Sequence, residues 1–362
     1  MPSLPEILCQ LIRFDTQNPG GNERALAEHI AERLSTHHPD ELALVDVPGR
    51  EGPRNGAYVY ARWGTPRVVV NAHVDTVPRN LGWTSDPLTA RIDNGRVIGL
   101  GAADTKGAIA CLLACLEETR PRDLAFLFSG DEERNGTCVR AFLKTPAARG
   151  IVRAIACEPT GCRVGTRHRG ILALEARFQG EGGHSSRADF MPAPIAELAR
   201  LAVALADWGR ERRDTGPPGF PGMCMNVAKL EGGVAFNVVP DAATLCFSLR
   251  PPPGTDTTSL GSELFNLAHR VVPSAQVRVA LDNPPFATRN VQSFMPLLGQ
   301  AVVSPMDLSF WTEAAVFASA GMDAVVFGPG DVSQAHAPGE WVSIGDLEDA
   351  KRIFARMFHG AV

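Results

Sequence analysis

The sequence predicts an α/β protein in which a domain with a mostly parallel sheet is interrupted by a smaller α+β domain. Three observations support this fold class. In the first part of the chain, short β-branched runs alternate with helical patterns, which is typical of strand–helix–strand units with parallel strands. From about Gly170 the pattern changes to that of a compact α+β insert. After about Val277 a helix, a strand and a final helix follow, with which the chain is expected to return to the first domain.

The first domain is expected to begin with two helices, because apolar residues recur at helical spacing in Leu4–Arg13 and Glu23–Leu34. Three later apolar runs are short, which predicts strands that are buried on both faces: Arg67–Ala72, Asp123–Ser129 and Val152–Cys157. A helix is predicted between the first two of these strands, over Gly107–Glu118.

The insert mixes both kinds of pattern around a Pro/Gly-rich break at Arg213–Gly222. Its predicted strands are Ile171–Gln179, Met225–Leu230 and Ala242–Arg250, and its predicted helices are Pro194–Trp208 and Ser259–Val271. In the returning part we expect a helix over Thr312–Ala320, a strand over Ala324–Phe327 and a helix over Ile344–Phe358.

Composition excludes several classes of protein. A chain of 362 residues is too long for one ordinary core, which indicates about two domains. The formal net charge is -5 and no stretch is rich in Lys or Arg, so nucleic acid is not an expected partner. The longest apolar run, Ala108–Leu116, is too short to cross a bilayer, and the N-terminus has no signal-peptide pattern. We therefore expect a cytoplasmic protein with no membrane partner, and buried free thiols for its eight cysteines, none of which forms a C-x-x-C pair.

Histidines and acids occur along the chain in an order that predicts a metal site. They are His73, Asp75, Asp104, Glu132, Glu133, Glu158 and His336. Two histidines and three carboxylates suit two divalent cations that share one bridging carboxylate, and a further carboxylate can handle a proton. Several of these residues directly follow predicted strands, and ligands of open α/β sheets lie beyond the carboxyl ends of strands.

Each of these residues alone has a simpler explanation. His73 and Asp75 could belong to a solvated turn, and Asp104 could cap the helix that follows it. The Glu132–Glu133 pair could be an acidic turn in solvent, and His336 could be an ordinary loop histidine. Their order along the chain, with each after a suitable element, favours the metal site over these separate explanations.

Eight motifs carry a resemblance to a known family. They are Asn71–Pro78, Gly99–Gly107, Ser129–Glu133, Cys157–Thr160, Gly182–Ser186, Asn237–Pro240, Trp311–Ala314 and Gly328–His336. Together they extend over nearly the whole chain, and they resemble the M20 family of dinuclear zinc hydrolases, in particular its acetylornithine deacetylase branch. The resemblance implies a catalytic domain of residues 1–165 and 277–362, with a dimerisation domain of residues 166–276 inserted in it, and a homodimer.

The resemblance also implies roles for single residues. One Zn²⁺ would bind His73, Asp104 and Glu158, and the other would bind Asp104, Glu133 and His336, with Co²⁺ as a possible substitute. Glu132 would act as general base, and Asp75 would orient His73. His184 would stabilise the developing oxyanion, often in the partner subunit's site, although it could also be a histidine in a Gly-rich turn.

Substrate contacts are expected from Asn237, Arg250 and the Gly328–Gly330 turn, through the Arg250 guanidinium and the backbone N–H groups of the two glycines. Arg250 could equally close a strand at the surface, and the glycines could form a simple tight turn.

The implied activity is hydrolysis of the amide bond of an N-acylated amino acid, a small-molecule substrate. N-acetyl-L-ornithine, in arginine biosynthesis, is the first expectation. N-acetyl-L-citrulline is the adjacent alternative, because Phe310–Ala315 and Gly328–His336 also resemble that offshoot. Dipeptidase or aminoacylase activity is a further alternative, and a non-catalytic amino-acid-binding protein on the same scaffold is a remote one.

Overall fold

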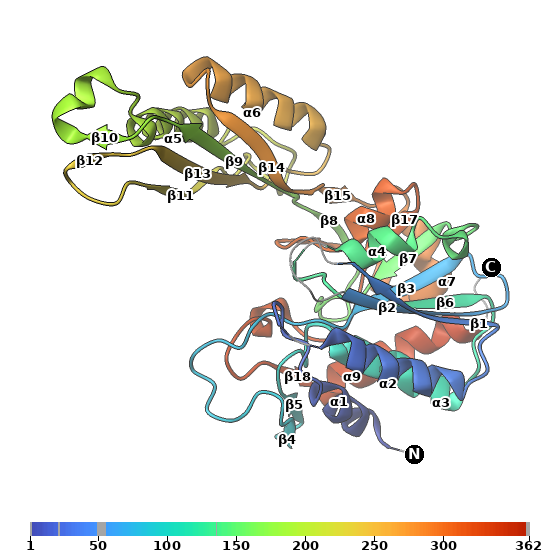
Figure 1. Ribbon diagram of the computed structural model, residues 1–362. Helices are drawn as coiled ribbons and strands as arrows, with labels where there is room; N and C mark the ends of the chain where they lie inside the picture. The colour runs from blue at the N-terminus through green and yellow to red at the C-terminus, as the bar shows by residue number, and fades with distance from the viewer. Residues whose placement is uncertain (1, 21, 49–55, 135, 360–362) are drawn as a thin grey trace. The chain divides into compact units, whose positions relative to one another are not determined.

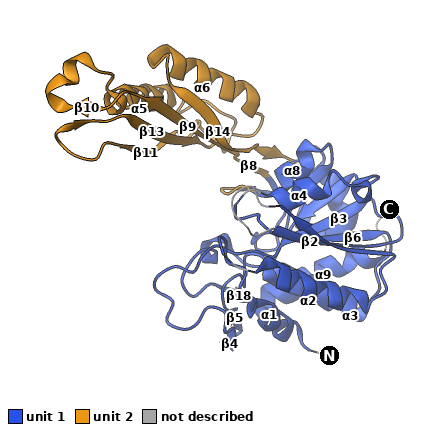
Figure 2. Cartoon of the chain, in the orientation of Figure 1, with its two compact units in different colours: residues 1–166, 288–307, 312–362 blue, residues 167–287, 308–311 orange. Residues whose placement is uncertain are grey.

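A computed structural model describes residues 2–20, 22–48, 56–134 and 136–359 of the chain. The chain divides into two compact units, which are coloured separately in Figure 2. Unit 1 consists of residues 1–166, 288–307 and 312–362, and unit 2 of residues 167–287 and 308–311.

Unit 1 is built on a sheet whose strands follow the order β1-β2-β6-β3-β7-β17, after which β8 continues from unit 1 into unit 2. The inner strands β6, β3, β7 and β17 pair in parallel, whereas β1 and β2 join the edge in antiparallel fashion. The mostly parallel sheet confirms the predicted fold class. The strands are β1 (Glu41–Val47), β2 (Gly56–Trp63), β3 (Val68–His73), β6 (Leu124–Ser129), β7 (Arg153–Ala156), β17 (Asp323–Val326) and β8 (Gly165–His168).

Helices cover both faces of this sheet, as Figure 1 shows. One layer contains α1 (Leu4–Ile12), α2 (Glu23–Ser35), α3 (Lys106–Glu118) and α9 (Ile344–Ala355), and the other contains α4 (Thr137–Phe142) and α8 (Ala314–Ser319). Shorter elements complete the unit: α7 (Met295–Leu298), η1 (Pro146–Ala148), η3 (Val291–Phe294), η4 (Gly299–Val302), η5 (Val332–Gln334) and η6 (Arg356–His359). A small sheet of order β18-β5-β4 is formed by β18 (Trp341–Ser343), β5 (Arg96–Ile98) and β4 (Arg91–Asp93).

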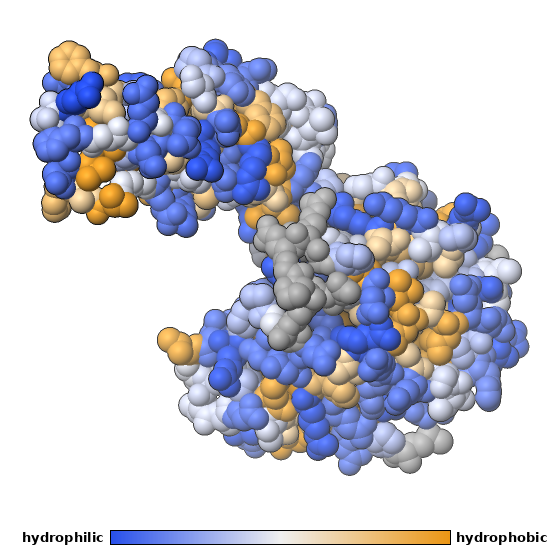
Figure 3. Space-filling model, in the orientation of Figure 1, coloured by the Kyte–Doolittle hydropathy of each residue, from blue (hydrophilic) through white to orange (hydrophobic). Residues whose placement is uncertain are grey.

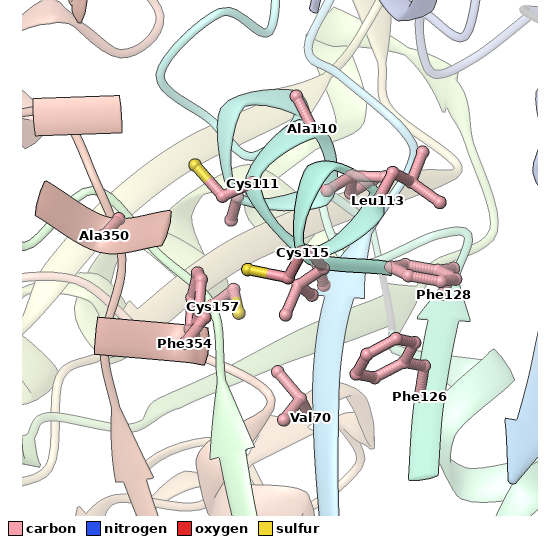
Figure 4. Packing of buried hydrophobic residues seen from close by; sticks show 14 of the residues in the cluster. Val70, Ala110, Cys111, Leu113, Cys115, Phe126, Phe128, Cys157, Ala350 and Phe354 are labelled. Atoms are coloured by element: carbon pink, nitrogen blue, oxygen red, sulfur yellow. The ribbon is translucent and has the colours of Figure 1, made fainter. Parts of the chain in front are cut away.

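The core of unit 1 lies between the sheet and α3. Residues 106–116 of α3 are all buried, because the helix is covered by the sheet, α1 and α9. Figure 4 shows the thiols of Cys111, Cys115 and Cys157 in this core, with Phe354 beside Cys157. All eight cysteines are free, but the prediction of buried thiols is wrong for Cys224, which is exposed. No helix in the described part of the chain is both long and apolar enough to cross a membrane.

Unit 2 has a four-stranded antiparallel sheet of order β11-β13-β9-β14, with two helices on one face. Every second residue of β13 is buried against α5 and α6, as expected for a sheet with one covered face. The strands are β9 (Ile171–Gln179), β11 (Asn226–Gly232), β13 (Ala242–Leu249) and β14 (Gln276–Asn283), and the helices are α5 (Pro194–Glu211) and α6 (Thr257–Val271). The insert was predicted to end at residue 276. In the structure β14 begins there and pairs with β9, so this part of unit 2 extends to residue 287.

A short ribbon extends one end of this sheet. It consists of β10 (Gly183–His184) and β12 (Val238–Val239), which pair with each other, and η2 (Ser185–Phe190) follows β10. At the other end of unit 2, β15 (Phe286–Ala287) pairs with β8, and β16 (Met306–Leu308) also pairs with β8.

Candidate metal centre

The predicted ligands lie at one edge of the unit 1 sheet. His73 is the last residue of β3, while Glu132 and Glu133 follow the end of β6 and Glu158 follows the end of β7. Because β3, β6, β7 and β17 run in parallel, their carboxyl ends meet at the same edge. The loop that carries His336 begins after β17 and therefore starts at that edge too.

Asp104 stands between the two histidines. Its Oδ1 atom lies 2.9 Å from His73 Nε2, and its Oδ2 atom lies 3.3 Å from His336 Nε2. His336 Nε2 is also 2.9 Å from Glu133 Oε1. One carboxylate therefore presents one oxygen to each histidine, which is the arrangement that a bridging ligand requires.

The remaining carboxylates are close enough to complete such a site. Ligand atoms of His73, Asp104 and Glu133 lie within 4.8 Å of one another, and so do those of His73, Glu132 and Glu158. Imidazole nitrogen and carboxylate oxygen are the donors that zinc takes readily. The donor set and its spacing thus fit metal ions, and this cluster could hold them.

Burial of this cluster shifts the pKa values of its acids and histidines. Burial raises the pKa of Glu132 and of Glu158 well above the usual range, and neighbouring carboxylates raise them further. His73 is buried, which lowers its pKa, but the hydrogen bonds to Asp104 and Asp75 outweigh this and raise the pKa well above its usual value. Hydrogen bonds to Asp104 and Glu133 raise the pKa of His336 to about 10. So many acids in a site shielded from water need positive charge beside them, which protons or cations can supply.

Asp75 was predicted to orient His73, but it also contacts several other groups. It is fully buried, and its Oδ1 atom lies 3.4 Å from His73 Nδ1. Its two oxygens also accept the backbone N–H groups of Glu132 and Glu133, both at 3.1 Å. The side-chain amide of Asn18 donates to Asp75 as well, at 2.6 Å. Asp75 therefore fixes the backbone of the segment that carries the predicted base and one ligand.

From the sequence, no position relative to the predicted site could be assigned to Glu313. It is buried, and its Oε2 atom accepts a hydrogen bond from Ser129 Oγ at 2.8 Å. Ser129 Oγ in turn accepts from the Asn71 side chain at 2.8 Å. Burial raises the pKa of Glu313 to about 8, so this carboxyl group is mostly protonated at neutral pH. The signal in the sequence was an acid within a matched motif, with nothing to show that it is buried.

Gly328 and Gly330 pack against the segment that follows Glu158. The N–H of Gly328 donates to Thr160 Oγ1 at 3.1 Å, so it is not available to a substrate carboxylate. A Cβ at Gly328 would lie 2.7 Å from the Glu158 carbonyl oxygen, which explains the absence of a side chain there. The Gly330 carbonyl accepts from Gly161 N at 2.6 Å. For Gly328 the predicted substrate contact is therefore replaced by close packing behind Glu158.

The predicted residues of unit 2 fall into two places. His184 lies on β10 opposite Val238, and Asn237 directly precedes that residue, so both are on the β10–β12 ribbon and both are exposed. Arg250 follows the last residue of β13 and is exposed. Because β13 begins beside the ribbon and runs away from it over eight residues, Arg250 is roughly 26 Å from the ribbon's end of the sheet. A single copy of unit 2 cannot bring His184 and Arg250 to the same small substrate.

Comparisons with known proteins agree with this geometry. The family model described as "Peptidase family M20/M25/M40" matches residues 69–359. The chain is 33% identical to an N-acetyl-L-citrulline deacetylase of Xanthomonas campestris pv. campestris, over 100% of this chain and 99% of the relative. It is 30% identical to an acetylornithine deacetylase of Myxococcus xanthus, over 98% of this chain and 97% of the relative. Its fold is similar to that of an M20 family metallo-carboxypeptidase from Sulfolobus solfataricus, with a TM-score of 0.77, 16% identity and 99% of each chain covered.

Proposed function

Because this chain belongs to the peptidase family M20/M25/M40, a family of metal-dependent hydrolases, we propose that it removes the acetyl group from an N-acetylated amino acid at a dinuclear zinc centre. One observation carries this proposal. The two oxygens of Asp104 face His73 and His336, and further carboxylates stand beside each histidine. The simpler explanations, a solvated turn for His73, an N-cap for Asp104 and a loop position for His336, do not account for this convergence of the three side chains.

The ligand sets that we propose are those implied by the resemblance to the family. One zinc ion would be held by His73, Asp104 and Glu158, and the other by Asp104, Glu133 and His336. Two dications against three carboxylates leave the centre net positive, which relieves the repulsion among the buried acids. Co²⁺ prefers similar donors and would serve as a spectroscopic substitute.

Bound zinc lowers the pKa of water and polarises the amide carbonyl of the substrate. Glu132 would accept a proton from the attacking water and later return it to the leaving amine. Asp75 holds the Glu132 backbone N–H, so the base approaches the reacting water from a fixed direction.

We also propose that the active enzyme is a homodimer. Since His184 and Asn237 lie far from Arg250 in unit 2, we propose that they serve the sites of different copies, with His184 in the partner subunit's site as the resemblance implies. Exposed apolar side chains support a second copy as the occupant: Val227 and Leu230 lie on the edge strand β11, Val203 lies on α5, and Phe236 lies beside the ribbon. Figure 3 shows hydrophobic residues gathered on this part of unit 2. An exposed edge strand offers unpaired backbone groups that a symmetric partner can complete.

The choice of substrate depends on the charge of its side chain. N-acetyl-L-ornithine is cationic and calls for an ionised acid in the pocket, whereas N-acetyl-L-citrulline is neutral. Of the two acids in the motifs Phe310–Ala315 and Gly328–His336, Glu313 is buried and accepts a bond from Ser129 Oγ, and Asp331 caps η5 through a bond from Ser333 N at 2.8 Å. Both carboxyl groups are engaged by neighbouring groups, so we favour N-acetyl-L-citrulline and keep N-acetyl-L-ornithine as the second candidate. The higher identity to the citrulline-directed relative supports the same order.

A direct assay tests the proposal. The zinc-loaded protein is incubated separately with N-acetyl-L-citrulline, N-acetyl-L-ornithine, N-acetyl-L-methionine and an unmodified dipeptide, and release of the free amine is measured. We expect the highest kcat/KM for the acetylated citrulline, then for the acetylated ornithine. Faster cleavage of the dipeptide would replace the deacetylase assignment by a peptidase one. Release from none of the four would contradict the proposed hydrolysis.

A further inference from the structure

Glu340 is a buried carboxylate that no ligand set includes. Its side chain accepts three backbone N–H groups from the loop that carries Asp104. Gly101 N donates to Oε2 at 2.8 Å, and Ala103 N and Asp104 N donate to Oε1 at 2.9 and 3.1 Å. The residue is 2% exposed. These contacts hold the backbone of residues 101–104 in place.

The same residue is tied to the segment that carries His336. Glu340 N donates to Ala337 O at 3.2 Å and closes the turn that follows His336. The carbonyl oxygen of Glu340 accepts a hydrogen bond from Gly99 N at 2.9 Å. Strand β18, which follows Glu340, pairs with β5, and the loop that carries Asp104 begins directly after β5. Glu340 thus joins two segments that are more than two hundred residues apart in the sequence. Those segments supply two of the three proposed ligands of one ion, Asp104 and His336.

Glu340 lies in a buried region beside Lys106. The ammonium group of Lys106 interacts electrostatically with Glu340, and its Nζ atom donates to Phe14 O at 3.0 Å. Burial and the neighbouring Asp104 raise the pKa of Glu340 to about 7. Lys106 is itself fully buried. Three accepted N–H groups tie the Glu340 side chain to the loop of Asp104. The carboxylate therefore keeps the loop in one conformation, in which both oxygens of Asp104 remain directed at the histidines.

We propose that Glu340 is a positioning residue of the metal centre, which holds the Asp104 loop and the His336 turn together and thereby sets the affinity of the ion bound by Asp104, Glu133 and His336. This inference rests on the metal centre of the proposed function, but not on the identity of the substrate. Residues behind metal ligands typically change metal affinity by about 10–100-fold when they are replaced. The ion that depends on both joined segments should be affected more than the ion held by His73 and Glu158.

Glu340→Gln is the sharpest variant, because it keeps the side chain's volume. The amide retains one accepting oxygen and turns an NH₂ group toward a backbone N–H, so at least one of the three bonds is lost. Ser343→Ala is the matched control. Ser343 lies three residues further along and caps α9 through Asp346 N at 2.8 Å, and among the described contacts its side chain does not touch the Asp104 loop.

The experiment measures zinc binding by the full-length, metal-free protein in competition with a chromophoric chelator. We expect two sites in the wild type, a loss of about 10–100-fold at one site in Glu340→Gln, and a smaller change at the other. In the cobalt-loaded protein, the visible spectrum of one of the two ions should change. The control should bind both ions with wild-type affinity. Should Glu340→Gln fail to fold, Glu340→Asp, which keeps the charge but draws it back by one methylene, should show a weaker loss at the same site.

Two results would overturn the inference. One is wild-type affinity at both sites in Glu340→Gln. The other is an equal loss of affinity in Ser343→Ala, which would show that general destabilisation explains the effect. Failure of the substrate proposal looks different: the wild type would bind two ions and cleave no acetylated amino acid, while the Glu340 effect on metal affinity would persist.

Discussion

The pKa of Asp104 is determined by its hydrogen-bond partners. The acid is held by hydrogen bonds from His73 and His336, which keep its pKa below the usual range despite burial. Among the described contacts, Glu132 has no such side-chain donor, and burial raises its pKa. The two carboxyl groups thus differ in their immediate partners, in keeping with the separate roles proposed for them, metal ligand and proton carrier.

This separation predicts the behaviour of Glu132 variants. Glu132→Ala and Glu132→Gln should lower kcat by about 10²–10⁴-fold, which is the usual contribution of a general base. Zinc content should stay near two per chain, because Glu132 is outside both proposed ligand sets. Metal analysis and steady-state kinetics of the same preparation check both points. Retained turnover would contradict the assignment of the base, and loss of one zinc ion would make Glu132 a ligand.

Glu313 predicts a pH dependence of stability. Its pKa is near 4.5 in the unfolded chain and about 8 when folded, so the native state binds the extra proton between these values. As pH rises through that window the native state loses stability, and the loss is complete above about pH 8. Glu313→Gln stays neutral, so its unfolding free energy relative to wild type should increase by on the order of 4 kcal/mol from about pH 4.5 to about pH 8.

Urea unfolding of the metal-free protein at several pH values measures this difference, because bound cations would lower the pKa of Glu313. Glu32→Gln, at an exposed position of α2, controls for the loss of one carboxyl group. Parallel stability curves for Glu313→Gln and wild type would show that Glu313 is ionised in the native state.

The ligand residues could be found in the sequence, and their supports could not. His73, Asp104, Glu158 and their companions are chemically distinctive and stand after recognisable strands. Glu340 and Asn18 act through backbone N–H groups or through another carboxylate, and any acid or amide in a loop looks the same until the chain is folded. A residue that serves the backbone leaves no side-chain pattern from which it could be predicted.

At the scale of elements, strands buried on both faces were predicted well, whereas the antiparallel edge was missed. β3, β6 and β7 are continuous apolar runs, and each was predicted to within about a residue or two at its ends. β1 is half-exposed along most of its length and contains Glu41 and Asp46, so its pattern matches neither a buried run nor a regular alternation. Its place in the sheet is decided by its pairing with β2.

Helix α9 predicts a measurable capping effect. Ser343 accepts Asp346 N at 2.8 Å, and the helix packs on α3 in the core of unit 1. Ser343→Ala leaves that N–H without its side-chain acceptor and should lower the unfolding free energy by about 1 kcal/mol. Denaturant unfolding checks the value, and Ser343→Asp, which restores an acceptor, should recover most of the loss. No recovery would mean that the cost arises from packing and not from the cap.

At the scale of the whole molecule, the distance between His184 and Arg250 predicts that inactive variants complement each other. In a mixed dimer of Glu132→Ala and His184→Ala chains, one site would combine an intact Glu132 with an intact His184 from the other chain. If subunits exchange freely, half of the dimers are mixed and each has one working site, so about a quarter of wild-type activity should return. Activity is measured after the two purified variants are mixed and allowed to exchange.

The two variants measured separately serve as controls and should stay inactive. No recovery after proven exchange would place His184 in the site of its own chain, which the length of β13 makes difficult for a substrate that also contacts Arg250.

The strand order of unit 1 has a consequence for the growing protein on the ribosome. β17 lies between β7 and β8, yet it is synthesised only after the whole of Arg167–Ala287. Until then β7 is an open edge of an unfinished sheet, while unit 2 already has every strand of its own four-stranded sheet and can close first. His336 emerges later still. The proposed ligand set of His73, Asp104 and Glu158 is therefore synthesised before β17, whereas the set of Asp104, Glu133 and His336 is completed only after the whole of unit 2.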